Sequence, residues 1–186
     1  MFGMKADRFT GRKILVAGAL DALGPALVHG LIRSGAGVLA TDRRPAPLTR
    51  LADWFDGVPQ VRAADPVEVG RWIIADHPDL AGLILADPHD GAGNAALSAH
   101  LLPLLAESTD SFLAVLHLSG GTHSLPVPPG VSLTVGYLAA PPTPTDAARL
   151  AARLLGAVQA RRGAVPLNRP RLPDLGWTGL ARSETC

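Results

Sequence analysis

Short apolar runs alternate along the chain with stretches in which apolar residues recur every three or four positions. A run that is apolar throughout indicates a strand covered on both faces, and the longer spacing indicates a helix with one buried face. Alternation of the two is typical of a parallel sheet flanked by helices. The predicted strands are 13–17, 37–41, 59–62, 83–86, 112–118, 131–138 and 164–167, and the predicted helices cover about 25–34, 47–55, 66–75, 95–107 and 146–161.

These elements predict an α/β fold with a Rossmann-like, doubly wound, mostly parallel sheet of about six or seven strands. A single domain is expected over residues 1–186, with an irregular tail over 168–186. Asp65 followed by Pro66 is a good start for the third helix, and Gly35 is a plausible left-handed end for the first.

The link between the fifth and sixth predicted strands departs from this pattern. It spans only 119–130 and contains three prolines. Neighbouring parallel strands need a crossover, usually a helix, which this segment cannot form. One covering helix is therefore expected to be missing. Because strand 112–118 has the composition of a strand buried on both sides, another subunit is expected to cover it.

Composition narrows the class of protein further. The chain has 186 residues, 47% of them hydrophobic, and a net charge of +1 without a basic stripe, so nucleic acid is not an expected partner. The only cysteine, Cys186, cannot form an internal disulfide, which fits a reducing compartment. No signal-peptide pattern opens the chain, and no apolar run approaches the roughly 20 residues needed to cross a bilayer. We therefore expect a soluble, cytoplasmic protein without a membrane partner.

A glycine-bounded loop, residues 18–24, joins the first predicted strand to the first predicted helix. Gly18 and Gly24 would let the backbone approach a pyrophosphate, which the N–H groups at the start of the helix attract. Asp42, at the end of the second strand, could bind a ribose 2′-hydroxyl and would repel a 2′-phosphate. The adjacent Arg43 and Arg44 weaken this preference for NAD over NADP. The alternative interpretation is a tight turn without a ligand.

Residues 9–42 resemble the first βαβ unit of the short-chain dehydrogenase/reductase family, and later segments resemble its remaining strands and helices. The family's loop is T-G-x-x-x-G-x-G. Ala17, Gly18 and Gly24 fit it, Ala22 replaces the middle glycine, and the family's Asn-Asn-Ala-Gly motif is lost at 83–88. The resemblance implies an oxidoreductase fold with NAD binding that is weak or vestigial. It implies a cofactor site made of Gly18, Leu20, Ala22, Leu23, Gly24, Asp42, Arg43, Asp65 and Ala86, with Asp65 at the adenine.

The family's catalytic pair, a tyrosine and a lysine four residues later on one helix, is absent. The chain holds one tyrosine, Tyr137, and two lysines, Lys5 and Lys13. Hydride transfer in this family needs a phenol whose pKa is lowered by the neighbouring ammonium. No catalytic residue is securely assigned. The candidates are Ser119, which aligns at or just before the family's serine, together with His117 and Tyr137.

Two other groups of residues receive structural interpretations. His77, His89 and Asp90 lack a metal-binding spacing, so they are expected to be solvated loop residues and no metal is expected. Trp54 and Trp72 lie at helical spacing among apolar residues and are expected in the core.

Three classes of function follow. The first is a non-catalytic, short-chain dehydrogenase-like subunit that associates with an active full-length relative, or otherwise with itself. The second is an NAD(P)-dependent oxidoreductase with atypical catalytic residues, and the third is a small NAD-binding or sensing module. The missing catalytic pair and the missing helix favour the first.

Overall fold

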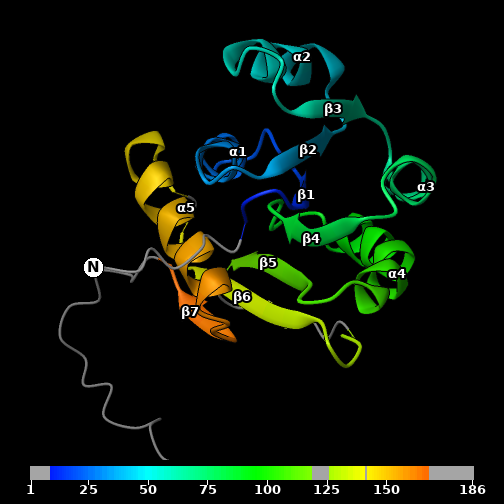
Figure 1. Ribbon diagram of the computed structural model, residues 1–186. Coiled ribbons are helices and arrows are strands. Elements are labelled where there is room, and N and C mark those ends of the chain that lie inside the picture. The colour runs from blue at the N-terminus through cyan, green and yellow to red at the C-terminus, as the bar shows by residue number, and fades with distance from the viewer. Residues whose placement is uncertain (1–8, 119–125, 141, 168–186) are drawn as a thin grey trace, which may run out of the picture.

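The computed structural model describes residues 9–118, 126–140 and 142–167 (Figure 1). In this part of the chain, the strands are β1 (Lys13–Ala17), β2 (Gly37–Asp42), β3 (Gln60–Ala63), β4 (Leu80–Leu85), β5 (Phe112–Leu118), β6 (Ser132–Leu138) and β7 (Ala164–Pro166). The helices are α1 (Gly24–Arg33), α2 (Pro45–Trp54), α3 (Pro66–Asp76), α4 (Gly91–Glu107) and α5 (Pro144–Gln159).

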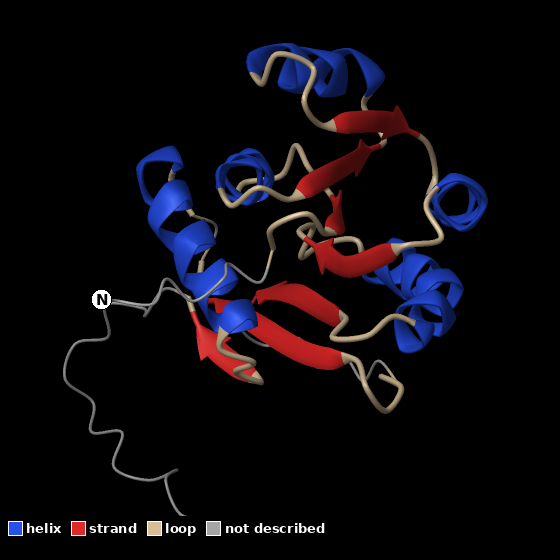
Figure 2. Ribbon diagram, viewed as in Figure 1, coloured by secondary structure: helices blue, strands red, loops and turns tan. Residues whose placement is uncertain are grey.

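The strands form one sheet in the order β3-β2-β1-β4-β5-β6-β7, and every neighbouring pair is parallel (Figure 2). The predicted fold class is confirmed, and the described sheet is parallel throughout rather than mostly parallel. The strand order reverses between β1 and β4. In open α/β sheets, ligands bind beyond the carboxyl ends of the strands at such a reversal.

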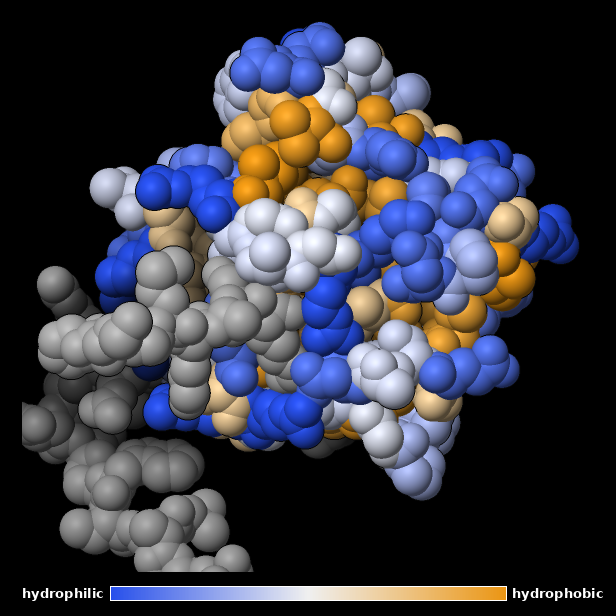
Figure 3. Space-filling view, viewed as in Figure 1, coloured by the Kyte–Doolittle hydropathy of each residue, from blue (hydrophilic) through white to orange (hydrophobic). Residues whose placement is uncertain are grey.

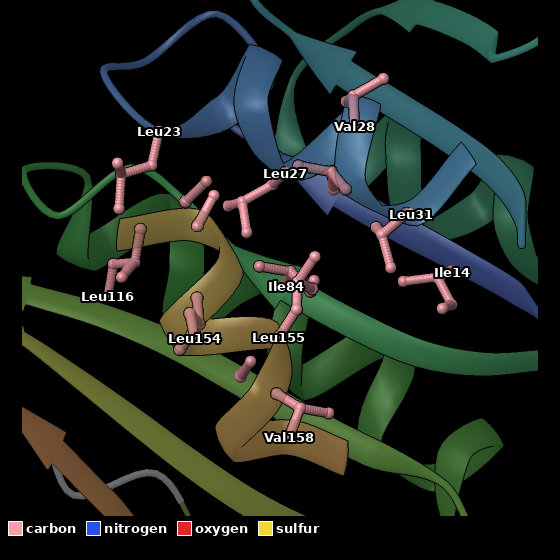
Figure 4. Packing of buried hydrophobic residues seen from close by; sticks show 14 of the residues in the cluster. Ile14, Leu23, Leu27, Val28, Leu31, Ile84, Leu116, Leu154, Leu155 and Val158 are labelled. Carbon is pink, nitrogen blue, oxygen red and sulfur yellow. The ribbon is translucent and has the colours of Figure 1, made fainter. Parts of the chain in front are cut away.

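Helices cover the two faces of the sheet unequally. On one face, α1, α2 and α5 enclose a core to which β1, β4 and β5 contribute alternate side chains (Figure 4). Ile14, Ile84 and Leu116 lie in this core against Leu27 of α1 and Leu154 of α5. On the other face, α3 and α4 pack over the remaining side chains of the same strands (Figure 1). The central strands are therefore buried on both faces, as their continuous apolar sequence predicts.

Two helix ends follow from local chemistry and match the sequence prediction. The Asp65 carboxylate accepts hydrogen bonds from the backbone N–H groups of Val67 and Glu68, and Pro66 is the first residue of α3. This arrangement satisfies two of the N–H groups that a helix leaves free at its start. Beyond α1, Gly35 has a φ of 76°, a left-handed conformation that costs glycine little.

The prediction that β5 lies bare beside the link to β6 is wrong. No helix occurs in the described part of the link between β5 and β6, which pair directly in parallel. However, Leu113 and Val115 of β5 are buried with the leucines of α4, so no second subunit is needed to cover β5. Side chains instead reach the surface on β6, where Leu133 and Val135 are partly exposed and Tyr137 is 39% exposed.

The burial of three further side chains, Trp54, Trp72 and His77, differs wholly or in part from the sequence prediction. Trp54 is 79% exposed because it ends α2 beyond the β3 edge of the sheet, so its assignment to the core is wrong. Trp72 is half-buried and packs against the core below α3. His77 is buried edge-on against Trp72, so it is not a solvated loop residue.

The surface in the view of Figure 3 is mostly hydrophilic, and hydrophobic residues come to it mainly in the upper half, around α2 and β3. Among the helices of the described residues, none combines the length and the apolar character that crossing a membrane requires.

Candidate functional site

Two cavities flank the loop 18–24 beyond the carboxyl ends of the strands. The first, of about 310 Å³, lies between the ends of β1 and β2 and the first turns of α3 and α4. The second, of about 200 Å³, lies over the ends of β5 and β6. Asp21 lines both cavities. Both cavities therefore adjoin the loop 18–24, where the sequence predicts a ligand site, and they meet at Asp21, near the reversal of strand order.

Most of the predicted cofactor residues line these cavities. Gly18, Asp42 and Arg43 lie in the wall of the first, and Ala22, Leu23 and Ala86 in the wall of the second. The other three, Leu20, Gly24 and Asp65, lie outside both walls. The Leu20 N–H donates to the Asp42 carboxylate at 3.3 Å, and the exposed Asp65 caps α3.

The two glycines of the loop are required by the turn itself. Gly18 has a φ of 75°, and a Cβ on it would lie 2.6 Å from Oδ2 of Asp21 and 2.7 Å from the backbone nitrogen of Asp87. A Cβ on Gly24 would lie 2.4 Å from the carbonyl oxygen of Ala19. Both positions exclude larger residues with or without a ligand. After this turn, α1 begins without a side-chain cap. The Gly24 N–H already donates to the carbonyl oxygen of Asp21 at 2.8 Å and the proline that follows has no N–H, so few of the first N–H groups of α1 are open to an anion.

Asp42 is held tightly by its neighbours. Arg44 donates from Nε to Oδ1 at 2.8 Å and from a terminal nitrogen to Oδ2 at 3.0 Å, and its backbone N–H donates to Oδ1 at 3.1 Å. Burial raises the pKa of Asp42, but the hydrogen bonds from Arg44 and from the Leu20 N–H outweigh burial and hold the pKa below its usual value. A ribose hydroxyl would have to compete with Arg44 for these oxygens. The preference for NAD that was inferred from Asp42 stays a prediction.

The remaining charges of the first cavity are partly paired. Arg43 forms an ion pair with Asp90 at 2.7 Å, and Asp90 also accepts a hydrogen bond from the Gly93 N–H at the start of α4. Asn94 of α4 donates to the carbonyl oxygen of Asp87 at 2.7 Å and so fixes the loop after β4. The Asp87 carboxylate in turn accepts from the backbone N–H groups of His89 and Asp90.

Asp21 differs from these residues because it shares its cation with another carboxylate. The nearest described one is the Arg44 guanidinium, at 3.5 Å, which is already bound to Asp42. Burial raises the pKa of Asp21 to about 6, with further contributions from Asp87 and Asp42, against the opposing effect of Arg44 and His89. Sequence reasoning missed Asp21 and Asp87 as site residues. The available signal was position, since Asp21 is the middle residue of the glycine loop and Asp87 closely follows β4.

The candidate catalytic residues are not gathered in the cavities. His117 is buried and stacks on Tyr137 with ring centroids 6.2 Å apart, but neither residue lines either cavity. Ser119 and Lys5 lie outside the described residues. Lys13 is the first residue of β1, at the opposite end of the strands from the cavities, and forms an ion pair with Asp79 at 2.8 Å. Within the described part of the chain, therefore, no tyrosine and lysine meet at the site.

No protein-family model and no curated protein matches the chain. Solved structures do match. A structure described as a short chain dehydrogenase from Shigella flexneri, complexed with NADP, is 18% identical with a TM-score of 0.68, and the match covers 86% of this chain and 97% of that one. An oxidoreductase of the short-chain dehydrogenase/reductase family from Burkholderia thailandensis is 18% identical with a TM-score of 0.65, over 84% of this chain and 90% of that one. The chain thus has the fold of short-chain dehydrogenase/reductase structures, which confirms at the level of fold the resemblance inferred from sequence.

Proposed function

We propose that the chain is a non-catalytic, short-chain dehydrogenase-like subunit that associates with an active relative and supports it. The observation that carries this proposal is the link between β5 and β6, which has no helix in its described part. The lack of a helix in that part of the link has one chemical and one structural consequence.

The chemical consequence concerns proton transfer. The resemblance places the Tyr–Lys pair on the helix that is missing, and 119–131 contains neither residue type. Tyr137 lies at the carboxyl end of β6, whereas Lys13 lies at the amino end of β1. The two residues are therefore at opposite ends of the parallel strands. Among the described residues, Tyr137 therefore lacks the neighbouring ammonium on which the acid–base chemistry of the resembled family depends.

The structural consequence is an exposed apolar face. Leu133, Val135 and Tyr137 alternate along β6. Leu133 is partly buried against the core that includes the leucines of α4, Val135 is partly exposed, and Tyr137 is 39% exposed, so the uncovered area is greatest at Tyr137. Full burial of such side chains contributes about 1.5–3 kcal/mol each. A helix of a partner subunit packed against β6 would gain that contribution. The preferred partner is a full-length short-chain dehydrogenase, and the alternative is a second copy of this chain.

The cofactor part of the proposal is weak binding of a dinucleotide with a preference for NAD. Two cavities that meet near the reversal of strand order support nucleotide binding. Ala22 in place of the middle glycine and the saturation of Asp42 by Arg44 support low affinity.

The proposal is tested by producing the chain alone and together with a full-length short-chain dehydrogenase from the same source. Light scattering coupled to gel filtration measures the mass of each preparation. The expected result is a mixed complex with higher dehydrogenase activity than the full-length partner alone. A well-folded monomer at micromolar concentration that stays separate from the relative would overturn it.

A second candidate is a small nucleotide-sensing module, and the observation in its favour is that the cavities meet at Asp21. This function predicts a monomer that binds the nucleotide by itself. An oxidoreductase with atypical residues has less support, because His117 and Tyr137 do not line the cavities.

A further inference from the structure

We propose that Asp21 makes dinucleotide binding dependent on the uptake of a proton. The paired cavities accept a diphosphate-containing ligand when Asp21 is neutral and reject it when Asp21 is ionised. This inference rests on the nucleotide binding included in the proposed function, and it adds a regulatory residue that the family resemblance does not supply.

Asp21 lies where a ligand that fills both cavities would have to pass. Asp21 is the residue shared by the walls of the two cavities, so a ligand that extends from one cavity to the other passes its carboxylate. In a dinucleotide, the part that joins the two ends is the diphosphate, with two negative charges. Oδ2 of Asp21 also lies 2.6 Å from where a Cβ of Gly18 would be. The carboxylate therefore lies against the backbone of the glycine turn, beside Asp87, where it would meet a diphosphate that approaches this turn.

The charged groups around Asp21 are mostly negative. Asp42 and Arg44 face it from the end of β2, and Asp87 and His89 face it from the loop after β4. The Arg44 guanidinium makes two hydrogen bonds to Asp42, at 2.8 and 3.0 Å, and one longer hydrogen bond to Asp21, at 3.5 Å. Two further carboxylates and one shared cation leave the ionised Asp21 in a negative environment. A diphosphate placed here would add to that repulsion.

A proton on Asp21 relieves the repulsion and adds a donor. A neutral carboxyl can donate a hydrogen bond to a phosphate oxygen, whereas a carboxylate can only accept. Asp21 has a pKa of about 6 in the free protein, for which burial and the two neighbouring carboxylates account. A bound diphosphate would raise this pKa further, because a like charge disfavours ionisation.

The direction of the pH dependence follows. Affinity for a dinucleotide is highest below pH 6, where Asp21 is neutral in the free protein. It falls as the pH rises through that value and levels off above the higher pKa of the complex. Each pKa unit by which the ligand raises Asp21 corresponds to a tenfold loss of affinity across this range.

The test is titration calorimetry of the full chain with NAD⁺ at pH 5.5 and pH 8.0, in buffers of different ionisation enthalpy. The wild type is expected to bind about tenfold or more weakly at pH 8.0. Net proton uptake on binding is expected in a further titration near pH 6.5, between the pKa values of the free protein and the complex, and is smaller at pH 5.5 and pH 8.0. Asp21→Asn is expected to bind at both pH values with the affinity that the wild type has at pH 5.5, without proton uptake. Asp53→Asn removes an exposed carboxylate on α2, away from both cavities, and should keep the wild-type pH dependence.

Binding by the wild type that does not change with pH would overturn the inference. So would an Asp21→Asn variant that fails to bind NAD⁺ at either pH while retaining the wild-type circular dichroism spectrum, because Asp21 would then not be the barrier. A variant that keeps the pH dependence would assign it to another group, such as His89. None of these outcomes bears on association with a partner, which light scattering measures separately. A wild type that binds no NAD⁺ at either pH would overturn this inference together with the cofactor part of the proposed function, whereas a pH-independent affinity would overturn this inference alone.

Discussion

Asp21 links the folding stability of the protein to pH. Its pKa rises from 3.8 to about 6 on folding, mainly through burial and then through Asp87 and Asp42. The folded state therefore holds a proton that the unfolded state releases, and stability falls as pH rises from about 4 to about 6. The destabilising charge is then present at every higher pH.

Replacing Asp21 by Asn should remove this effect. Two pKa units correspond to about 3 kcal/mol, but solvent screens a partly exposed side chain, so about 1 kcal/mol is expected. Urea unfolding should show that Asp21→Asn raises the free energy of unfolding by about this amount at pH 8 and by less at pH 4.5. An equal gain at both pH values would mean that the charge of Asp21 is not the cause.

Gly24 provides a second test at the residue scale. A methyl group on Gly24 would lie 2.4 Å from both the carbonyl carbon and the carbonyl oxygen of Ala19, which are backbone atoms that cannot move aside cheaply. Gly24→Ala should lower the free energy of unfolding by about 1–3 kcal/mol in urea titrations, without any ligand.

A matched glycine gives the control. Gly156 lies within α5, and a Cβ there would meet nothing within 4 Å. Gly156→Ala should therefore stabilise the protein by about 0.5–1 kcal/mol, because alanine loses less backbone entropy in a helix. If the two variants behaved alike, the close packing of the loop 18–24 would be refuted.

At the scale of elements, β6 is the place to test association. Tyr137 is 39% exposed on its outer face, and Tyr137→Asp should turn an oligomer of this chain, or its mixed complex, into monomers. Ile74→Asp is the control, since Ile74 is 49% exposed on α3 and on no proposed interface. Light scattering should show dissociation for the first variant alone. Dissociation by both variants would point to general loss of structure.

The substitutions Leu113→Asp and Leu116→Asp cannot serve this purpose. Both leucines are buried in the single chain, at 0% and 1% exposure, so an aspartate there would disrupt the core. This reflects what apolar pattern can predict. The sequence of β5 predicts burial on both faces, but not that α4 supplies one of the covers. In β6, burial alternates in the structure, with Thr134, Gly136 and Leu138 buried and their neighbours less so. Apolar pattern alone does not predict this, because apolar side chains also stand at the less buried positions.

The same limit applies to the site. Strand ends and glycine turns follow from local pattern, which is why the loop 18–24, Asp42 and the carboxyl edge of the sheet were predictable. The two hydrogen bonds of Arg44 to Asp42 depend on side-chain conformations, which local pattern does not determine. The same is true of the position of the Asp21 carboxylate beside Gly18. The prediction that Trp54 lies in the core is wrong for a related reason. Helical spacing does not tell whether the end of a helix extends past the outermost strand.

At the scale of the whole molecule, the purified chain is expected to show no NAD(P)H-coupled turnover of carbonyl or alcohol substrates. The reason is that Tyr137 has no lysine partner in the described part of the chain and does not line the cavities. Absorbance at the nicotinamide band measures turnover directly. Robust turnover that is lost in His117→Ala or Ser119→Ala, with the fold intact, would favour an oxidoreductase with atypical residues.

The order of the strands also governs how the chain can fold during synthesis. β1 forms ladders with β2 on one side and with β4 on the other, and β4 begins at Leu80. Until the ribosome has released that segment, the apolar residues 13–17 form an open strand edge, which invites pairing with other chains. The last strand, β7, can pair only after α5 has emerged. Such distant pairings make folding slow, so the emerging first half of the chain is the stage most exposed to aggregation.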